Sequence, residues 1–350
     1  MDFALASPVR AAAEAALEIG DVGYASSAIV PPAFAAFARD RFGWSVDERS
    51  VFAIPDVMAG VAEALHLLTR PTAAVVINPP VYPPFFDVIA HEDRRVVEVP
   101  LLQDAASGWV IDFGALERAF SQGAQAYLLC SPHNPVGRVW SKAELSEIAA
   151  LAARYRVAVI SDEIHAPLTM PGVTFVPFLT VAQEQRCVAL LSASKAWNIS
   201  GLKCAVMVAT PESLRDAVAA RLKSRPDEIE SRIGHLGVLA SVAAFRDGAA
   251  WLDDLLAYVD GNRHLLAELL RDHIPLVRYS PPDATYLAWI DCTDLHLDGD
   301  AASRFLQRGR VALEPGYKFG RTSKNWVRLN IGTSRAILRE IVARMAMALK

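Results

Sequence analysis

The chain has 350 residues and a mass of 38.0 kDa, enough for one large domain and a smaller one. Its formal net charge is −4, from 35 basic and 39 acidic residues, and Lys and Arg form no continuous stripe. This pattern argues against nucleic acid and anionic membranes as partners. Hydrophobic residues make up 53% of the chain, which is typical of a well-packed globular protein.

The cysteines and the N-terminal segment predict a cytoplasmic protein. The four cysteines are far apart and form no C-x-x-C pair, which is typical of buried thiols in a reducing compartment. They are Cys130, Cys187, Cys204 and Cys292. Arg10, Glu14 and Glu18 interrupt the alanine-rich start, so it does not have the apolar core of a signal peptide. No uninterrupted apolar run approaches the length of a membrane span.

Strand-like and helical patterns alternate from about residue 60 to residue 210. In chain order we expect a helix over Val57–Leu68, strands at Ala73–Ile77, Val96–Val99 and Ala126–Cys130, a helix over Lys142–Tyr155, and strands at Val157–Ile160, Val188–Leu191 and Ala205–Ala209. This alternation predicts an α/β fold, with a mostly parallel sheet covered by helices on both faces.

The pattern changes after residue 210. A long amphipathic helix (Trp251–Leu270), a strand (Tyr286–Ile290), a helix around Ala301–Arg308, a strand (Trp326–Ile331) and a closing helix to Lys350 are expected there. They predict a smaller α+β domain. We therefore expect a large domain over residues 20–255 and a small C-terminal domain over 256–350, with residues 1–19 packing near the small one.

Polar residues follow four of the expected strands. Ligands of open α/β sheets bind beyond the carboxyl ends of the strands, so these segments are expected to line one crevice. The segments are Asn78-Pro-Pro80, Ser131-Pro-His-Asn-Pro135, Ser161-Asp-Glu163 and Ser192-Ala-Ser-Lys195.

The last of these segments suggests a cofactor. The hydroxyls of Ser192 and Ser194 are donors for an anion, and a lysine with a lowered pKa forms Schiff bases with carbonyl compounds. Pyridoxal phosphate carries both a carbonyl and an anion, so Lys195 is a candidate to bind it covalently. The alternative is a solvated lysine at a strand end.

Four further residues each allow a functional and a structural interpretation. Asp162 would pair with a protonated pyridine nitrogen, or cap the turn after its strand. Asn134 would donate to the phenolic oxygen of the cofactor, or serve as a turn residue before proline. Tyr82 would stack on the cofactor ring, or pack as an ordinary core aromatic. Arg328 would bind the carboxylate of an amino acid in a bidentate pair, or lie at the surface of an edge strand.

Other chemistries lack their motifs in this sequence. There is no G-x-G-x-x-G after a strand, no phosphate loop of the nucleotidase kind and no G-x-S-x-G elbow. His165 has no partner at metal-ligand spacing, so no metal site is expected.

Three motifs in this order closely resemble the fold type I pyridoxal phosphate enzymes: Ser131–Gly137 (SPHNPVG), Ser161–His165 (SDEIH) and Ser192–Lys203 (SASKAWNISGLK). Within that superfamily the chain resembles the MalY/PatB branch of cystathionine β-lyases. The resemblance covers nearly the whole chain and includes Met1–Phe3, Gly23-Tyr24, Pro79–Phe85, Thr285–Trp289, Glu314–Gly320 and Arg328–Asn330.

The resemblance implies a role for each candidate residue. Lys195 would be the Schiff-base lysine and proton shuttle, with Asp162, Tyr82 and His165 as the other catalytic residues. Arg328 and Asn330 would bind the substrate. Tyr24 would reach the phosphate of a neighbouring subunit's cofactor, which implies a homodimer with shared active sites. The cofactor-binding set is Lys195, Asn134, Asp162, Tyr82, Ser192, Ser194, Lys203, Tyr24 and the backbone amides of Val57 and Met58 at a helix N-terminus.

The reaction implied is β-elimination from cystathionine or a related S-substituted cysteine, giving a thiol, pyruvate and ammonia, in methionine biosynthesis. His165 stands where many aminotransferases of this superfamily carry a tyrosine, which favours the lyase branch. An aminotransferase of class I/II is the alternative, because both reactions share their early steps. A catalytically idle cofactor-binding regulator is the third interpretation. The sequence does not identify the thiol that leaves.

The chain departs from the family pattern at two places. The family has a leading segment before the counterpart of Met1, and this segment covers part of the active-site entrance. Asp56 stands where the family usually has glycine. Its carboxylate is expected to cap the following helix and to compete with the cofactor phosphate for the same donors.

Overall fold

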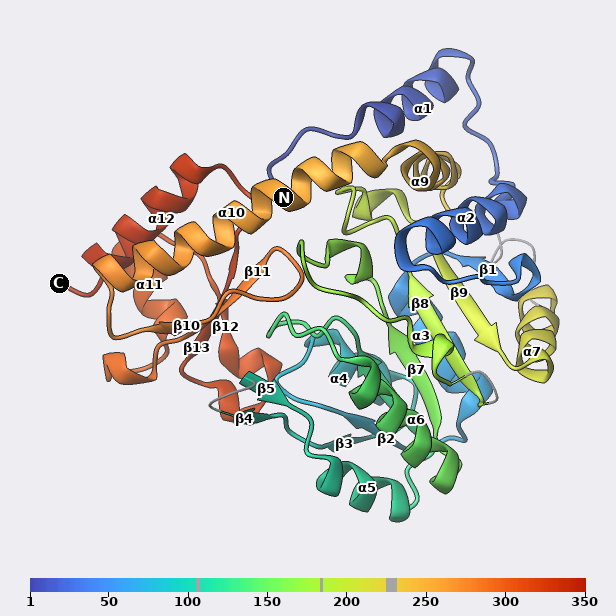
Figure 1. Ribbon diagram of the computed structural model, residues 1–350, viewed down its shortest axis with the longest axis horizontal. Coiled ribbons are helices and arrows are strands. Elements are labelled where there is room, and N and C mark those ends of the chain that lie inside the picture. The colour runs from blue at the N-terminus through green and yellow to red at the C-terminus, as the bar shows by residue number, and fades with distance from the viewer. Residues whose placement is uncertain (105–107, 183–184, 225–231) are drawn as a thin grey trace.

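A seven-stranded sheet forms the centre of the larger part of the chain (Figure 1). The computed structural model describes residues 1–104, 108–182, 185–224 and 232–350. The strands lie in the order β1 (Val51–Ile54), β9 (Ala205–Thr210), β8 (Cys187–Leu191), β7 (Ala158–Asp162), β6 (Ala126–Cys130), β2 (Ala74–Ile77) and β3 (Arg95–Glu98). Only β9 runs against its neighbours in this sheet, so the prediction of a mostly parallel sheet is confirmed.

Alternate residues of the strands point to opposite faces and build two apolar clusters. Ile77, Leu128 and Ile160 belong to one cluster, whose helices are α3 (Val57–Leu68), α4 (Pro84–His91) and α7 (Glu212–Lys223). Leu129, which follows Leu128, and Val159, which precedes Ile160, belong to the other cluster. The helices that contribute to it include α2 (Val30–Phe42), α5 (Phe113–Ser121), α6 (Lys142–Tyr155) and α9 (His235–Asp247). The central strands are therefore buried on both faces, which explains their uninterrupted apolar runs.

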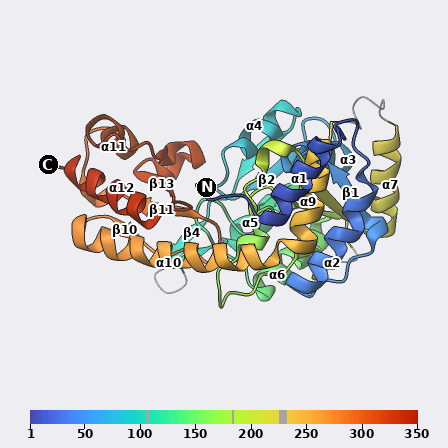
Figure 2. The ribbon, with the colours of Figure 1, turned by 90° about the horizontal axis from the view of Figure 1, so that it is seen from above.

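The C-terminal part is built on a smaller antiparallel sheet. Its order is β10 (Arg278–Tyr279), β11 (Leu287–Asp291), β13 (Trp326–Asn330) and β12 (Glu314–Pro315), with α11 (Ala301–Gly309) and α12 (Arg335–Met347) packed beside it. This is the α+β arrangement that the sequence predicts. The helix α10 (Ala249–His273) extends from α9 to the smaller sheet, and Figure 2 shows it joining the two parts. The proposed domain division after residue 255 falls within α10 and stays a prediction.

The N-terminal segment contacts both parts of the chain. α1 (Ser7–Glu18) packs on α9, beside the larger part (Figure 1). The N–H of Asp2 donates to the carbonyl oxygen of Gly332 at 2.8 Å, next to the smaller sheet. A separate hairpin is formed by β4 (Leu102–Asp104) and β5 (Gly108–Val110). None of the described helices is long and apolar enough to cross a membrane.

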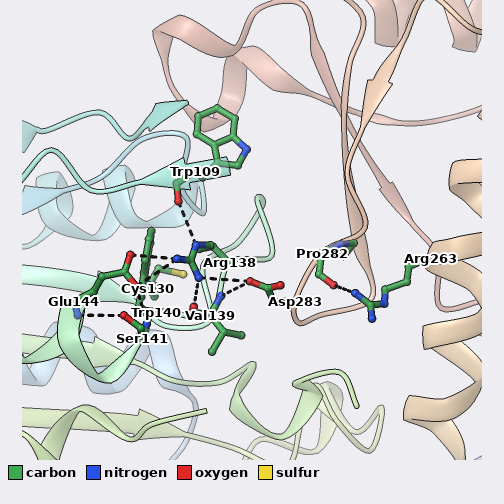
Figure 3. Close-up of polar contacts among 10 residues, drawn as sticks. All are labelled: Trp109, Cys130, Arg138, Val139, Trp140, Ser141, Glu144, Arg263, Pro282 and Asp283. Atoms are coloured by element: carbon green, nitrogen blue, oxygen red, sulfur yellow. Dashed lines mark hydrogen bonds and ion pairs between the residues drawn. The ribbon is translucent and has the colours of Figure 1, made fainter. Parts of the chain in front are cut away.

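The loop after β6 holds the two parts together (Figure 3). Arg138 on this loop forms ion pairs with Glu144 at 3.3 Å and with Asp283, from the smaller part, at 3.6 Å. Gly137 has a positive φ of 71°, and a Cβ atom there would lie 2.2 Å from Cβ of Pro282, so only glycine allows this close approach. The same loop carries Asn134, so the junction between the parts lies beside a predicted site residue.

Candidate active site

The carboxyl ends of β6, β7 and β8 open into a single cavity of about 610 Å³. The smaller sheet contributes to it through β13, and α3 contributes its first turn. Every predicted site residue except Tyr24 lines this cavity. These residues are Val57, Met58, Tyr82, Asn134, Asp162, His165, Ser192, Ser194, Lys195, Lys203, Arg328 and Asn330.

Lys195 lines the cavity, where its ordinary protonated state is disfavoured. Burial lowers the pKa of its amine, and the positive charges of Arg328 and Lys203 lower it further, while the carboxylate of Asp162 opposes the shift. A lysine with a lowered pKa has a larger neutral fraction, and the neutral amine is the form that reacts with carbonyl groups and accepts protons.

Asp162 is the last residue of β7 and is 4% exposed. Burial raises the pKa of its carboxyl to about 6, although a hydrogen bond from the N–H of Ile164 (3.1 Å) and the charge of Lys195 act in the opposite direction. A buried carboxylate of this kind is stabilised by a cation. A protonated ring nitrogen in the cavity would provide such a partner.

Asn134 and Arg328 lie 194 residues apart in the sequence but form a direct pair. Arg328 Nη1 donates to Asn134 Oδ1 at 3.0 Å, which leaves the amide hydrogens of Asn134 to donate to another acceptor. The guanidinium of Arg328 also lies 4.8 Å from the ring centre of Phe319. Burial lowers its pKa, and Glu314, opposite Arg328 on the neighbouring strand, opposes this shift. Arg328 is therefore a half-buried cation that faces the cavity, and the interpretation as a surface arginine is wrong.

The aromatic residues Tyr82, His165 and Tyr286 form part of the wall. Tyr82 is half-buried and packs edge-on against Phe85, with ring centres 5.8 Å apart. His165 packs edge-on against Tyr286 at 6.3 Å, and its Nδ1 atom has no hydrogen-bond partner among the described residues. Burial lowers the pKa of His165 to about 3, and the charges of Lys195 and Arg328 add to this effect. The imidazole is therefore neutral at physiological pH.

Several hydrogen-bond donors line the cavity. Ser192 Oγ accepts from the N–H of Ser194 at 3.0 Å and donates to the carbonyl oxygen of Cys204 at 2.7 Å. The first turn of α3 presents the amides of Val57 and Met58. Lys203 Nζ donates to Asp56 Oδ2 at 2.9 Å. Asp56 Oδ1 accepts from the N–H of Ala59 at 2.8 Å, so the predicted helix cap is confirmed. The ion pair between Asp56 and Lys203 was not predicted.

Tyr24 and Asn330 differ from the other predicted residues. Tyr24 is 88% exposed and lies outside the cavity, so within one copy of the chain it contributes nothing to the site. Asn330 is exposed at the cavity mouth, and its Oδ1 accepts from the N–H of Gly332 at 2.8 Å.

Sequence reasoning missed several residues of the cavity wall. Cys130 ends β6 beside the conspicuous Ser131–Pro135 segment, so the strand-end rule applied to β6 itself would have included it. Tyr286 and Glu314 belong to segments that carry the family resemblance, but nothing in the sequence alone gives them a position in the cavity.

The donor set fits pyridoxal phosphate. The cavity combines a lysine with a lowered pKa, a buried carboxylate that needs a cation, an amide next to an arginine, and a cluster of anion donors at a helix N-terminus. A metal ion has no comparable set, because the described residues include no group of three His, Cys, Asp or Glu side chains placed to hold one.

Comparisons with known proteins agree with this geometry. Residues 8–345 match the model of the aminotransferase class I and II family. The chain is 44% identical over 376 residues to a Mycobacterium tuberculosis protein named "Putative cystathionine beta-lyase", and 32% identical over 357 residues to cystathionine beta-lyase PatB of Bacillus subtilis. Each match covers 100% of this chain and 90% of the relative. The crystal structure of the PLP-bound C-S lyase from Staphylococcus hominis has a TM-score of 0.92 and 26% identity, over 100% of this chain and 89% of that one.

Proposed function

This chain belongs to the aminotransferase class I and II family, and we propose that it is a pyridoxal phosphate-dependent C–S β-lyase. It cleaves cystathionine or a related S-substituted cysteine to a thiol, pyruvate and ammonia. The observation that carries this function is the cavity in which Lys195, Asp162, Asn134 and Arg328 meet, in a chain whose relatives are named as lyases of this kind.

Four residues would hold the ring of the cofactor. Lys195 would bind it covalently, Asp162 would pair with its protonated nitrogen, Asn134 would donate to its phenolic oxygen and Tyr82 would stack on its face. The phosphate would be bound by Ser192, Ser194, Lys203 and the amides of Val57 and Met58. When bound, pyridoxal phosphate supplies an electron sink that stabilises negative charge at the substrate Cα.

Arg328 and Lys195 would act on the substrate itself. Arg328 would bind the α-carboxylate, because its half-buried guanidinium faces the cavity beside Asn134. The substrate amine would first take the place of Lys195 on the cofactor, and the freed Nζ of Lys195 would then remove the proton from Cα and return it to the departing sulfur. The electron pair of the C–S bond leaves with the sulfur, and water hydrolyses the remaining three-carbon unit to pyruvate and ammonia. Neutral His165 would pack beside the substrate without adding charge. Asn330, which is exposed, would also contact the substrate.

We also propose a homodimer in which Tyr24 of the partner subunit completes the phosphate site. The segment around Tyr24 exposes apolar side chains, with Leu17, Ile19 and Val22 between 58% and 79% exposed. An apolar segment of this kind is typical of a surface that another chain covers. A tyrosine hydroxyl from that chain would add a donor to Ser192, Ser194 and Lys203.

The proposed setting is the cytoplasm. All four cysteines are buried and free, which is the state expected of thiols in a reducing compartment. With cystathionine as the substrate, the thiol released is homocysteine, so we place the reaction in methionine biosynthesis.

The test is a substrate panel with the purified, cofactor-loaded protein. Pyruvate release is measured with cystathionine, cystine and S-methylcysteine, and amino-group transfer is measured with a panel of keto acids. We expect pyruvate from at least one sulfur amino acid at a rate well above any transfer to a keto acid. Transfer without pyruvate release would make the chain an aminotransferase, and cofactor binding with neither activity would make it a regulator.

A further inference from the structure

Among the residues proposed to bind the phosphate, one cation is paired with a carboxylate. Asp56 Oδ2 accepts from Lys203 Nζ at 2.9 Å, and Asp56 Oδ1 accepts from the N–H of Ala59 in the first turn of α3 at 2.8 Å. Lys203 is one of the groups that would hold the cofactor phosphate, and the N–H of Ala59 follows those of Val57 and Met58 in the same turn. A negatively charged side chain of the protein therefore already uses Lys203, a donor that the phosphate needs.

The charge balance of the cavity shows what Asp56 changes. The described lining carries three basic and three acidic side chains, so their formal charges cancel. They are Lys195, Lys203, Arg328, Asp56, Asp162 and Glu314. Without Asp56 the same lining would carry one net positive charge. Because the phosphate brings negative charge, the carboxylate of Asp56 weakens the attraction that the cavity exerts on it.

The ion pair is accessible and can be exchanged. The side chain of Asp56 is 39% exposed and that of Lys203 is 55% exposed. Ion pairs at such positions contribute little to stability, so an incoming anion can replace one partner at small cost. The carboxyl of Asp56 also stays ionised at neutral pH, because bonds from Ala59 and Lys203 lower its pKa although burial opposes them.

We propose that Asp56 is a resident counterion of the phosphate site. In the cofactor-free protein it holds Lys203, and the lysine must leave Asp56 for the phosphate when the cofactor binds. This inference rests on the proposed function. It has two consequences. First, Asp56 lowers the affinity for the cofactor below the value that the phosphate donors alone would give. Second, this loss of affinity depends on the phosphate of the cofactor and not on its ring.

The test compares two ligands and matched variants. Dissociation constants of the cofactor-free protein for pyridoxal phosphate and for pyridoxal, which lacks the phosphate, are measured by tryptophan fluorescence. Asp56→Asn removes the charge and keeps a residue that caps helices as well as aspartate does. Asp112→Asn is the control, because Asp112 caps α5 with the same 2.8 Å bond, here to the N–H of Ala115, and does not line the cavity. Asp56→Ser repeats the test if thermal unfolding shows that Asp56→Asn does not fold.

The expected result is tighter binding of pyridoxal phosphate to Asp56→Asn, by roughly threefold, which is the order expected for competition with one exposed ion pair. Binding of pyridoxal should be unchanged, and Asp112→Asn should match the wild type with both ligands. In a Lys203→Met background the gain should shrink, because the contested lysine is gone.

Three results would overturn the proposal that Asp56 is a counterion of the phosphate site. Weaker binding of pyridoxal phosphate to Asp56→Asn would mean that Asp56 positions Lys203 for the phosphate. Unchanged binding would mean that Asp56 is only a helix cap. An equal gain with pyridoxal would mean that its effect does not depend on the phosphate. A wild-type protein that binds no pyridoxal phosphate would reject the proposed function as well, so the two failures are distinguishable.

Discussion

Replacing Arg328 by methionine tests the substrate site directly. The structure places the guanidinium beside Asn134, at 3.0 Å, and over the ring of Phe319, at 4.8 Å, in a half-buried position that faces the cavity. Methionine keeps an unbranched apolar side chain at this position, but it is shorter and has no charge and no donors. The substrate carboxylate would then enter the cavity without a partner.

The size of the effect follows from the burial of this cation. Loss of one partner from a desolvated, hydrogen-bonded charge pair costs about 2–5 kcal/mol. At about 1.4 kcal/mol for each factor of ten, kcat/KM for the lyase reaction should fall by roughly 30-fold to 4,000-fold. Cofactor affinity should change far less, because the phosphate donors lie on other elements, on α3 and after β8.

The assay measures kcat/KM for pyruvate release and the dissociation constant of pyridoxal phosphate in parallel. Arg335→Met is the matched control, because Arg335 lies 5.0 Å from the ring centre of Tyr258 but does not line the cavity. We expect kcat/KM and the dissociation constant of Arg335→Met to stay within a factor of two of the wild-type values. If Arg328→Met weakens cofactor binding and leaves kcat/KM per bound cofactor unchanged, Arg328 is a scaffold residue and the carboxylate binds elsewhere.

Three further predictions concern other residues. Lys195→Ala should abolish turnover and the covalent labelling that borohydride reduction gives, and peptide mapping of the wild type should find the label on Lys195; a label on another lysine would reject the assignment. Burial raises the pKa of Glu163 to about 8. Between about pH 5 and pH 8 the folded protein therefore keeps a proton that the unfolded chain releases. Because of this group, the free energy of unfolding falls by about 1.4 kcal/mol for each pH unit of increase in that range. Urea unfolding should show this slope reduced in Glu163→Gln, and an unchanged slope would mean that Glu163 ionises normally. Tyr24→Phe should weaken cofactor binding if the hydroxyl serves a neighbouring subunit; sedimentation of an active monomer would contradict the shared site.

The central elements could be predicted because their signals are local. The helix over Val57–Leu68 has an aspartate cap before it and an apolar face along it, and its observed bounds are the predicted ones. The buried strands β6, β7 and β8 are short apolar runs that end in polar residues. Their parallel alignment brings Asp162 and Lys195 to the same edge of the sheet, which is why the strand-end rule found the cavity.

The rest of the fold depends on contacts that have no local signal. β1 has only four residues, Val51–Ile54, and exists because it pairs with β9. The hairpin strands β4 and β5 carry no residue that is buried, so hydrophobic periodicity does not mark them.

The pairs that shape the site are also distant in sequence. Arg328 and Asn134 are separated by 194 residues, and Lys203 and Asp56 by 147. Residue types and motifs identified each of these residues, but only the packing of the smaller part and of α3 onto the sheet determines which of them touch. The sequence therefore predicted the members of the site better than the bonds between them.

The most direct test of the proposed reaction is product analysis in a single turnover with cystathionine. Excess cofactor-loaded protein is mixed with a limiting amount of substrate and the products are quantified. The lyase account predicts one pyruvate and one free thiol for each substrate consumed, with the cofactor returned unchanged and bound to Lys195. Stoichiometric conversion of the cofactor to its aminated form, with little pyruvate and no free thiol, would contradict the account and identify an aminotransferase.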